Sequence, residues 1–189
     1  MALEMNFFRM ALTIIVTINF SMASAQIAEP ILGISLGGQV SFDKCDVSQG
    51  KNWCQVSFST PDFLALNPPD HLGPNALPTW VRQERIYIRP SKDGIIEAFS
   101  VNTFGPSVQD RVLKSISGRF GEPTSLRKRM AQTATGATFE VAYAQWVTAD
   151  AVVVHVCSRM DQCNVRFLTL TGWTAQEAEW QQRLKRDTL

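Results

Sequence analysis

Cysteine and histidine are the residue types in this chain that are best suited to chemistry. The chain contains four cysteines and two histidines, and the cysteines form two pairs that are close in sequence. These residues are Cys45, Cys54, Cys157 and Cys163, with His71 and His155. Their side chains support thiol catalysis beside an imidazole, zinc binding or disulfide formation. An even number of cysteines in an exported chain favours disulfides.

Thiol catalysis requires a free cysteine near a histidine. His155 lies two residues before Cys157, so the two side chains share one face of an extended strand. A disulfide would remove that thiol, and His71 has only its sequence neighbour Asp70, which adjacency alone does not orient as a partner. The chain also lacks a Gly-x-Ser-x-Gly elbow and a His-Glu-x-x-His motif. We therefore predict no catalytic residues and keep a cysteine- or histidine-dependent enzyme as an alternative.

Zinc binding is the other alternative for the cysteines. The spacings are Cys-x8-Cys for Cys45 and Cys54 and Cys-x5-Cys for Cys157 and Cys163, and neither is typical of a zinc finger or ribbon. We predict no metal site and no cofactor. Four cysteines allow three disulfide pairings. We favour the two local pairings, each of which would stabilise the fold by about 2–3 kcal/mol on a chain-entropy model.

The first residues have the pattern of an export signal. A short segment with Arg9 is followed by the apolar stretch 10–20, and residues 23–25 form an Ala-x-Ala pattern before Gln26. A retained membrane anchor is the rival interpretation, but a spanning helix needs about 20 apolar residues, so we favour cleavage. We therefore predict a cleaved signal peptide at 1–25, a periplasmic or secreted mature chain, and no transmembrane segment after cleavage.

The charge balance argues against a nucleic-acid partner. The chain has 18 basic and 17 acidic residues, with a formal net charge of +1, so it has no global basic field. Arg127, Lys128 and Arg129 form a local basic cluster, which we interpret as a solvated loop after a helix, with a small binding patch as the alternative. A protein or an envelope component is the partner that we expect, in an oligomeric state that the sequence leaves open.

Several strands are predicted from alternating or β-branched residues. They lie at residues 31–36, 54–58, 85–89, 95–103 and 138–146, and a β-hairpin spans residues 151–170, with a cysteine at each end of its tip. Residues 61–78 contain five prolines and are predicted to form a long loop. Because long loops in compact domains are often functional, this loop, which contains His71, is a candidate surface for a partner.

Two helices complete the predicted fold. The first is capped by Ser107 with Asp110 three residues later and ends at Gly121, and the second begins with a Thr174–Glu177 capping box. Antiparallel strands with few helices between them predict an α+β fold. We expect a single domain over residues 26–189, with an antiparallel sheet of about 5–6 strands and helices packed on one face.

Two short motifs carry a family resemblance. Residues 32–37 read Leu-Gly-Ile-Ser-Leu-Gly and are followed by a cysteine, and residues 119–124 read Arg-Phe-Gly-Glu-Pro-Thr at the end of a helix. In this order the chain resembles small, mostly uncharacterised exported α+β proteins of Gram-negative bacteria. These are broadly similar to outer-membrane assembly lipoproteins and β-lactamase inhibitors in architecture. The resemblance implies a periplasmic setting and carries no catalytic residues.

The predicted hairpin tip at 157–163 is faintly similar to the disulfide-closed loop of a periplasmic inhibitor of vertebrate-type lysozyme. That family's loop places a histidine and an acidic residue in the enzyme cleft. Asp161 matches the acidic residue, whereas Arg159 would stand in for the histidine. Our first hypothesis is a non-catalytic binding or envelope-associated module. The alternative is an inhibitor of an exogenous hydrolase, with Arg159, Asp161 and His71 as candidate binding residues.

Overall fold

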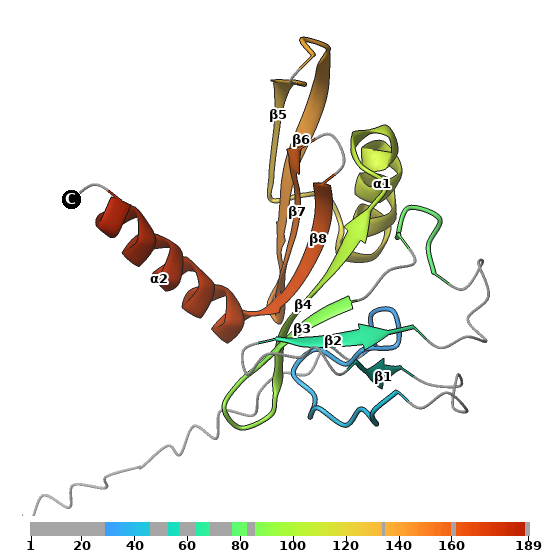
Figure 1. Cartoon of the computed structure of the whole chain (residues 1–189), viewed down its shortest axis with the longest axis vertical. Helices are drawn as coiled ribbons and strands as arrows, with labels where there is room; N and C mark the ends of the chain where they lie inside the picture. Colours follow the sequence, from blue (N-terminus) through green and yellow to red (C-terminus); the bar gives the residue numbers. More distant parts are fainter. Residues whose placement is uncertain are drawn as a thin grey trace, which may run out of the picture.

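The computed structural model describes residues 29–45, 53–56, 63–68, 77–82, 86–133, 135–159 and 162–187. They form one antiparallel sheet with the strand order β1-β2-β3-β4-β8-β7-β6-β5, shown in Figure 1. The strands are β1 (Cys54–Gln55), β2 (Leu64–Asn67), β3 (Ile86–Pro90), β4 (Ile96–Thr103), β5 (Ser125–Gln132), β6 (Thr138–Val147), β7 (Ala151–Arg159) and β8 (Gln162–Thr169). The helices are the 3-10 turn η1 (Pro106–Val108), α1 (Gln109–Phe120) and α2 (Leu170–Asp187).

The order of the strands follows from one long connection. Strands β1 to β4 are neighbours in sequence and in space, and the chain then crosses through α1 to the far edge of the sheet. From that edge, β5 to β8 return as a four-stranded meander, so that β8 pairs with β4 in the middle of the sheet. The predicted hairpin at 151–170 is therefore central to the fold.

The predicted α+β class with about 5–6 strands is wrong, because the fold is predominantly β with eight strands. Two of the additional strands lie where we predicted loops. Strand β2 lies inside the proline-rich segment, and β5 contains the basic cluster that we interpreted as a solvated loop. Five of the eight β5 residues are exposed in succession, and the apolar residue that packs on a core cluster is the small Ala131, so no alternation of large apolar residues indicates a strand.

The first predicted strand, at 31–36, is instead a tight turn. Leu32 and Gly33 both have positive φ values, 54° and 77°, and Ile31 and Ile34 exchange two backbone hydrogen bonds of 2.9 Å. Positive φ at both central residues defines a type I′ turn, which glycine favours. The turn places Ile34 and Leu36 in the core, where both are about 1 % exposed.

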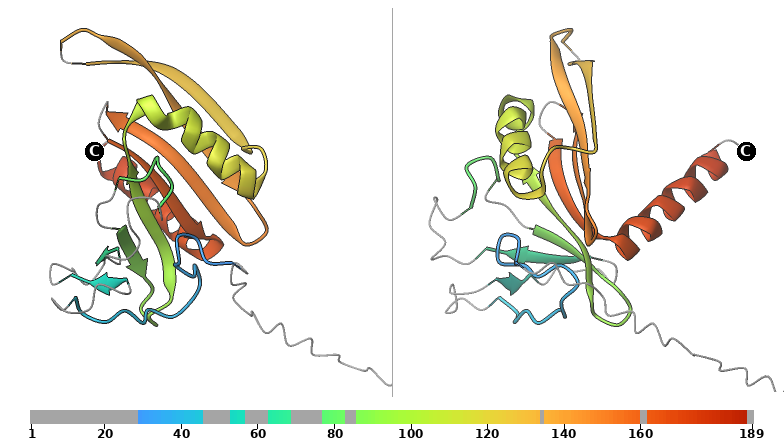
Figure 2. Two further views of the ribbon diagram at one scale, coloured as in Figure 1. Left: turned by 90° about the vertical axis from the view of Figure 1, so that its right-hand side faces the viewer. Right: turned by 180° about the vertical axis from the view of Figure 1, so that it is seen from behind.

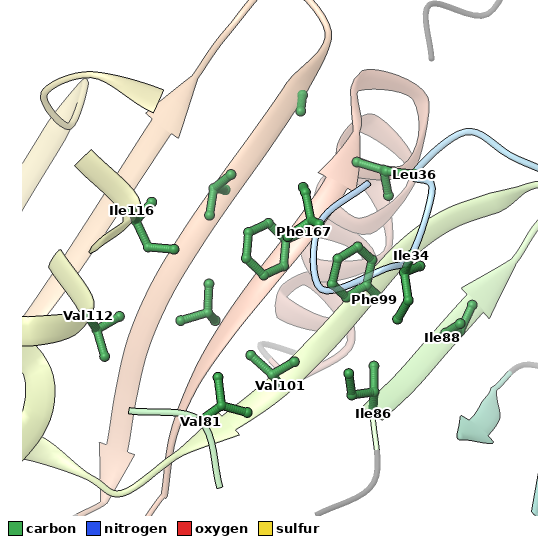
Figure 3. Close-up of a cluster of buried hydrophobic side chains, with 14 of the residues drawn as sticks. Ile34, Leu36, Val81, Ile86, Ile88, Phe99, Val101, Val112, Ile116 and Phe167 are labelled. Atoms are coloured by element: carbon green, nitrogen blue, oxygen red, sulfur yellow. The ribbon is translucent and has the colours of Figure 1, made fainter. Parts of the chain in front are cut away.

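The main core lies between α1 and one face of the sheet. Phe99 of β4 and Phe167 of β8 stack with ring centroids 4.7 Å apart, and Val112 and Ile116 of α1 cover the same face. Figure 3 shows these side chains converging with Ile34 and its neighbours from the N-terminal turn. Burial of these apolar groups supplies the dominant stabilisation of this half of the molecule.

Helix α1 ends as predicted but begins differently. Gly121 has φ 80° and closes the helix, and its carbonyl accepts a 3.0 Å hydrogen bond from Nε1 of Trp146. The predicted Ser107 cap is absent. Pro106–Val108 form the 3-10 turn η1, and neither η1 nor α1 has a side-chain cap at its start. The first helical residue is Gln109, whose side chain turns inward to the sheet and not outward to solvent.

The prediction that the helices pack on one face is also wrong. Figures 1 and 2 show α1 and α2 on opposite sides of the sheet. On the α2 side, Trp173 packs against Val152, Val154 and Leu168, which form a second apolar cluster. Helix α2 begins at Leu170, directly after β8, so the predicted Thr174 start is four residues late. Because β8 lies in the middle of the sheet and has apolar residues on both faces, α1 covers one face and α2 the other.

Both cysteine pairs form disulfides. Cys45 is bonded to Cys54, which begins β1, and Cys157 is bonded to Cys163 across the β7–β8 hairpin. These are the two local pairings that the spacing favoured. No helix in the described part of the chain is long and apolar enough to span a membrane.

Candidate functional site

Three of the predicted site residues lie at or beyond the limits of the described structure. Arg159 is the last residue of β7, and Asp161 and His71 lie outside the described residues. The Cys157–Cys163 disulfide closes the base of this hairpin tip. The use of the tip as an inhibitory probe therefore stays a prediction.

The His155–Cys157 pair is close in space but is not arranged for thiol chemistry. Nε2 of His155 lies 3.8 Å from Sγ of Cys157, and that sulfur belongs to a disulfide. His155 is fully buried, and burial lowers its pKa to about 4, with a smaller opposing effect from the Asn164 backbone. The ring is therefore neutral at neutral pH and has no access to solvent.

A groove of about 490 Å³ lies on the face of the sheet opposite α1. Its floor is formed by the outward-facing residues of β4 and β8, one wall by β3 and the residue before β2, and the other by α2. The pairing of β4 with β8 determines which residues meet on this floor, because it places Ser100 opposite Arg166 and Asn102 opposite Asn164. This volume is in the range of small-molecule binding sites, about 300–1,000 Å³.

Two aromatic side chains stand on one side of the groove. Phe63 is 49 % exposed and Tyr87 is 42 % exposed, although large aromatic residues usually bury more of their surface. The register of β2 and β3 places Ala65 opposite Tyr87, so Phe63 and Tyr87 rise from the same face of the sheet. Exposed aromatic faces of this kind stack on sugar rings or other flat apolar groups.

The two arginines of the groove differ in their charge partners. Arg89 pairs with the carboxylate of Glu179 on α2 through both oxygens. Arg166 donates from Nε to Oδ1 of Asn164 at 3.2 Å, and it makes no ion pair with any described carboxylate. The positive charge of Arg89 is therefore neutralised, whereas Arg166 offers its guanidinium to an incoming anion.

Helix α2 reaches the groove because Gly172 lies directly against β4. A Cβ atom at this position would lie 2.5 Å from the carbonyl oxygen of Glu97, which is closer than real Cβ contacts. A glycine thus permits the crossing of α2 over β4. This approach places Gln176 and Glu179 at the groove wall.

Replacement of Gly172 by alanine is expected to displace α2 and to lower the free energy of unfolding by about 1–3 kcal/mol, as overpacking does. The matched control is Gly118→Ala, because a Cβ on the exposed face of α1 meets no atom within 4 Å. That control should stabilise the protein by up to about 1 kcal/mol, the helix propensity difference between the two residues. Thermal unfolding of both variants shows whether each substitution raises or lowers the free energy of unfolding. A stabilised Gly172→Ala protein would contradict the close packing of α2 against β4.

The described lining of the groove contains few side chains that titrate near neutral pH. Its described lining contains no histidine or cysteine, and its carboxylate, that of Glu179, is held by Arg89. In the described part of the chain, no three His, Cys, Asp or Glu side chains are grouped as metal ligands.

Sequence reasoning missed the groove because its polar residues alternate with the core residues of β4 and β8. Ser100 and Asn102 alternate with buried Phe99, Val101 and Thr103, and this pattern usually means a solvated outer face. The only signal was Tyr87, an aromatic residue on the outward side of a predicted strand. Comparison of the chain with protein-family models, with curated proteins and with solved structures gave no match.

Proposed function

We propose that this chain is a non-catalytic, exported binding module whose groove holds an envelope component with an anionic group beside a ring. The observation that carries the proposal is the placement of Arg166, without an acidic partner among the described residues, in one groove with the exposed rings of Phe63 and Tyr87. A carboxylate or phosphate would bind the guanidinium, and a sugar ring would stack on the aromatic side chains.

The amides of the groove support the same ligand class. Asn164 orients the Arg166 guanidinium through its Oδ1 atom, and its side-chain nitrogen remains a donor for ligand oxygens. Hydroxyl- and carboxylate-rich ligands need several such donors and acceptors around a mostly apolar floor. Ala98 and Leu168, which belong to the apolar cluster on the α2 side, form the apolar part of that floor.

The covalent framework supports an exported setting. All four cysteines are paired in two disulfides, and such bonds persist in the periplasm or outside the cell but are rare in the cytosol. With the signal pattern at 1–25, this makes envelope components the ligands that the groove would meet. The proposed localisation is periplasmic or secreted.

Soluble peptidoglycan fragments are suitable probes because they combine sugar rings with carboxylates. We expect a disaccharide-peptide to bind in titration calorimetry, and Arg166→Gln to weaken binding about tenfold, the loss of one charge-assisted hydrogen bond. A neutral chito-oligosaccharide, with similar rings and no carboxylate, should bind weakly and be insensitive to this change. Arg111→Gln is the matched control, because Arg111 lies on α1 and donates to Thr79.

Equal affinity of the native protein and Arg166→Gln for the charged fragment would contradict the anionic part of the proposal. Unchanged affinity after Tyr87→Ala would contradict the ring-stacking part. Absence of binding by every sugar fragment would exclude this ligand class for the groove.

A further inference from the structure

The edge of the sheet formed by β5 is open. Strand β5 is last in the strand order and pairs only with β6, through eight consecutive residue pairs without a register shift. Its other side presents unpaired backbone donors and acceptors to solvent. The opposite edge of the sheet is the two-residue strand β1, which offers far less backbone.

Natural edge strands are usually shortened, bulged, interrupted by proline or covered. Strand β5 has none of these features among the described residues: it has eight residues, regular pairing and no proline. Figure 1 shows the β5–β6 hairpin extending beyond the body of the sheet. Only its charged side chains would oppose pairing, so their arrangement decides which strand this edge accepts.

The two faces of β5 have different chemistry. Arg127 and Arg129 lie on one face, and neither makes an ion pair with a described acidic residue. The other face carries Leu126 and Met130, which are 47 % and 63 % exposed, and Lys128, whose charge is taken up by Glu140 at 2.9 Å. Leu126 lines a pocket together with Leu113 and Lys114 of α1, so this second face is the one toward α1.

An open pocket of about 410 Å³ adjoins that second face. It lies between α1 and the beginning of β5, and its apolar lining comes from Leu113, Pro123 and Leu126. Because side chains alternate across a strand, a segment paired with β5 would direct every second side chain toward the α1 side, and the one beside Leu126 would face this pocket. Its remaining side chains would meet Arg127 and Arg129 on the other face.

We propose that β5 binds an extended segment of a partner protein in which acidic and apolar residues alternate. The backbone of the segment would extend the sheet, its acidic residues would face Arg127 and Arg129, and an apolar residue would enter the α1–β5 pocket. A second copy of this chain fits less well. Pairing of two β5 strands would place both pairs of arginines on the same face, where like charges repel.

The test uses the full chain and a labelled eight-residue peptide that alternates glutamate with leucine or valine. Fluorescence anisotropy is expected to show binding, and Arg127→Glu with Arg129→Glu is expected to weaken it at least tenfold. The same double variant should instead gain affinity for a peptide with lysine in place of glutamate. Arg111→Glu is the charge control on α1, and Arg166→Gln separates this surface from the groove, since both should leave peptide affinity unchanged.

Two further probes test the backbone and the pocket. A peptide with the same side chains but N-methyl groups along both edges should lose binding, because it cannot extend the sheet, and Leu126→Ala should weaken binding of the unmodified peptide. Native affinity for the methylated peptide, or an unaffected double arginine variant, would overturn the proposal. A concentration-dependent dimer that Arg127→Glu with Arg129→Glu alters would assign the edge to a second copy and would also overturn it.

Discussion

Lowering the pH from 7 to 4 is expected to reduce the free energy of unfolding by about 3 kcal/mol through His155 alone. Burial lowers the pKa of this ring to about 4, whereas it is about 6.5 in an unfolded chain. Between these values the unfolded state binds a proton that the native state excludes. The contribution of the neutral His155 ring to the free energy of unfolding is therefore complete above pH 6.5. It is lost as the pH falls toward 4 and changes little below that value.

Denaturant unfolding of the disulfide-bonded protein between pH 7 and 4 measures this loss. His155→Leu, which removes the titrating ring from its apolar site, is expected to flatten the profile, most clearly between pH 6.5 and 5, above the range where most carboxylates titrate. His71→Gln measures what the other histidine of the chain contributes to the profile. NMR titration of the native imidazole gives a second readout, and a His155 ring that titrates near pH 6.5 would contradict its neutral, buried state.

Replacement of Gln109 by alanine is expected to cost about 2–4 kcal/mol, because two backbone groups of β6 lose their partners. Nε2 of Gln109 donates to the Glu140 carbonyl at 3.0 Å, and its Oε1 accepts from the Ala142 N–H at 2.9 Å. The ladder between β6 and β7 extends only as far as the pair Ala144–His155. Beyond this pair, the Gln109 side chain thus supplies the hydrogen-bond partners of β6 that a neighbouring strand would otherwise provide.

Gln109→Met distinguishes the hydrogen bonds from the packing, because methionine is of similar length but can neither donate nor accept a strong hydrogen bond. We expect this variant to be nearly as destabilised as Gln109→Ala, with faster hydrogen exchange at the amide of Ala142. Lys114→Ala is the control for a surface change on α1 and should stay within about 0.5 kcal/mol of the native protein. A Gln109→Met protein of native stability would show that the two bonds contribute little.

Gln109 also connects the stability of the fold to its proposed surfaces. It anchors the part of β6 that carries Glu140, and β5 pairs with β6 along this whole stretch. Because β5 has no other strand neighbour, its position depends on that of β6. Loss of the Gln109 bonds should therefore loosen the β5 edge before it affects the groove, which lies on β3, β4, β8 and α2.

The elements that the sequence predicted well are those with a strong local pattern. The strands predicted at 85–89 and 95–103 correspond to β3 and β4, and Ile86 and Ile88 of β3 are buried. The end of the first predicted helix at Gly121 is confirmed, since α1 ends at Phe120 and Gly121 follows it as the C-cap. These features depend on short-range periodicity and turn geometry, which the chain carries in a few adjacent residues.

The elements that the sequence did not predict depend on contacts between distant residues. Strand β2, at Leu64–Asn67, is surrounded by prolines and is defined by pairing with β3, and β5 is a strand because β6 is beside it. The predicted Thr174 helix start failed because α2 continues directly from β8, where Trp173 covers the outer side of Val152 and Leu168. Residues 170–174 contain no local pattern that indicates which face of the sheet the helix will cover.

The sequence by itself determined the local pairing of the cysteines and the course of the central hairpin and of α1, because each is encoded within a few neighbouring residues. The tertiary structure alone decided that the sheet has eight strands with helices on opposite faces. It also brought Phe63, Tyr87 and Arg166 to one groove and left β5 at an open edge. Those outcomes depend on strand order and register, which arise only when segments far apart in the chain pack together.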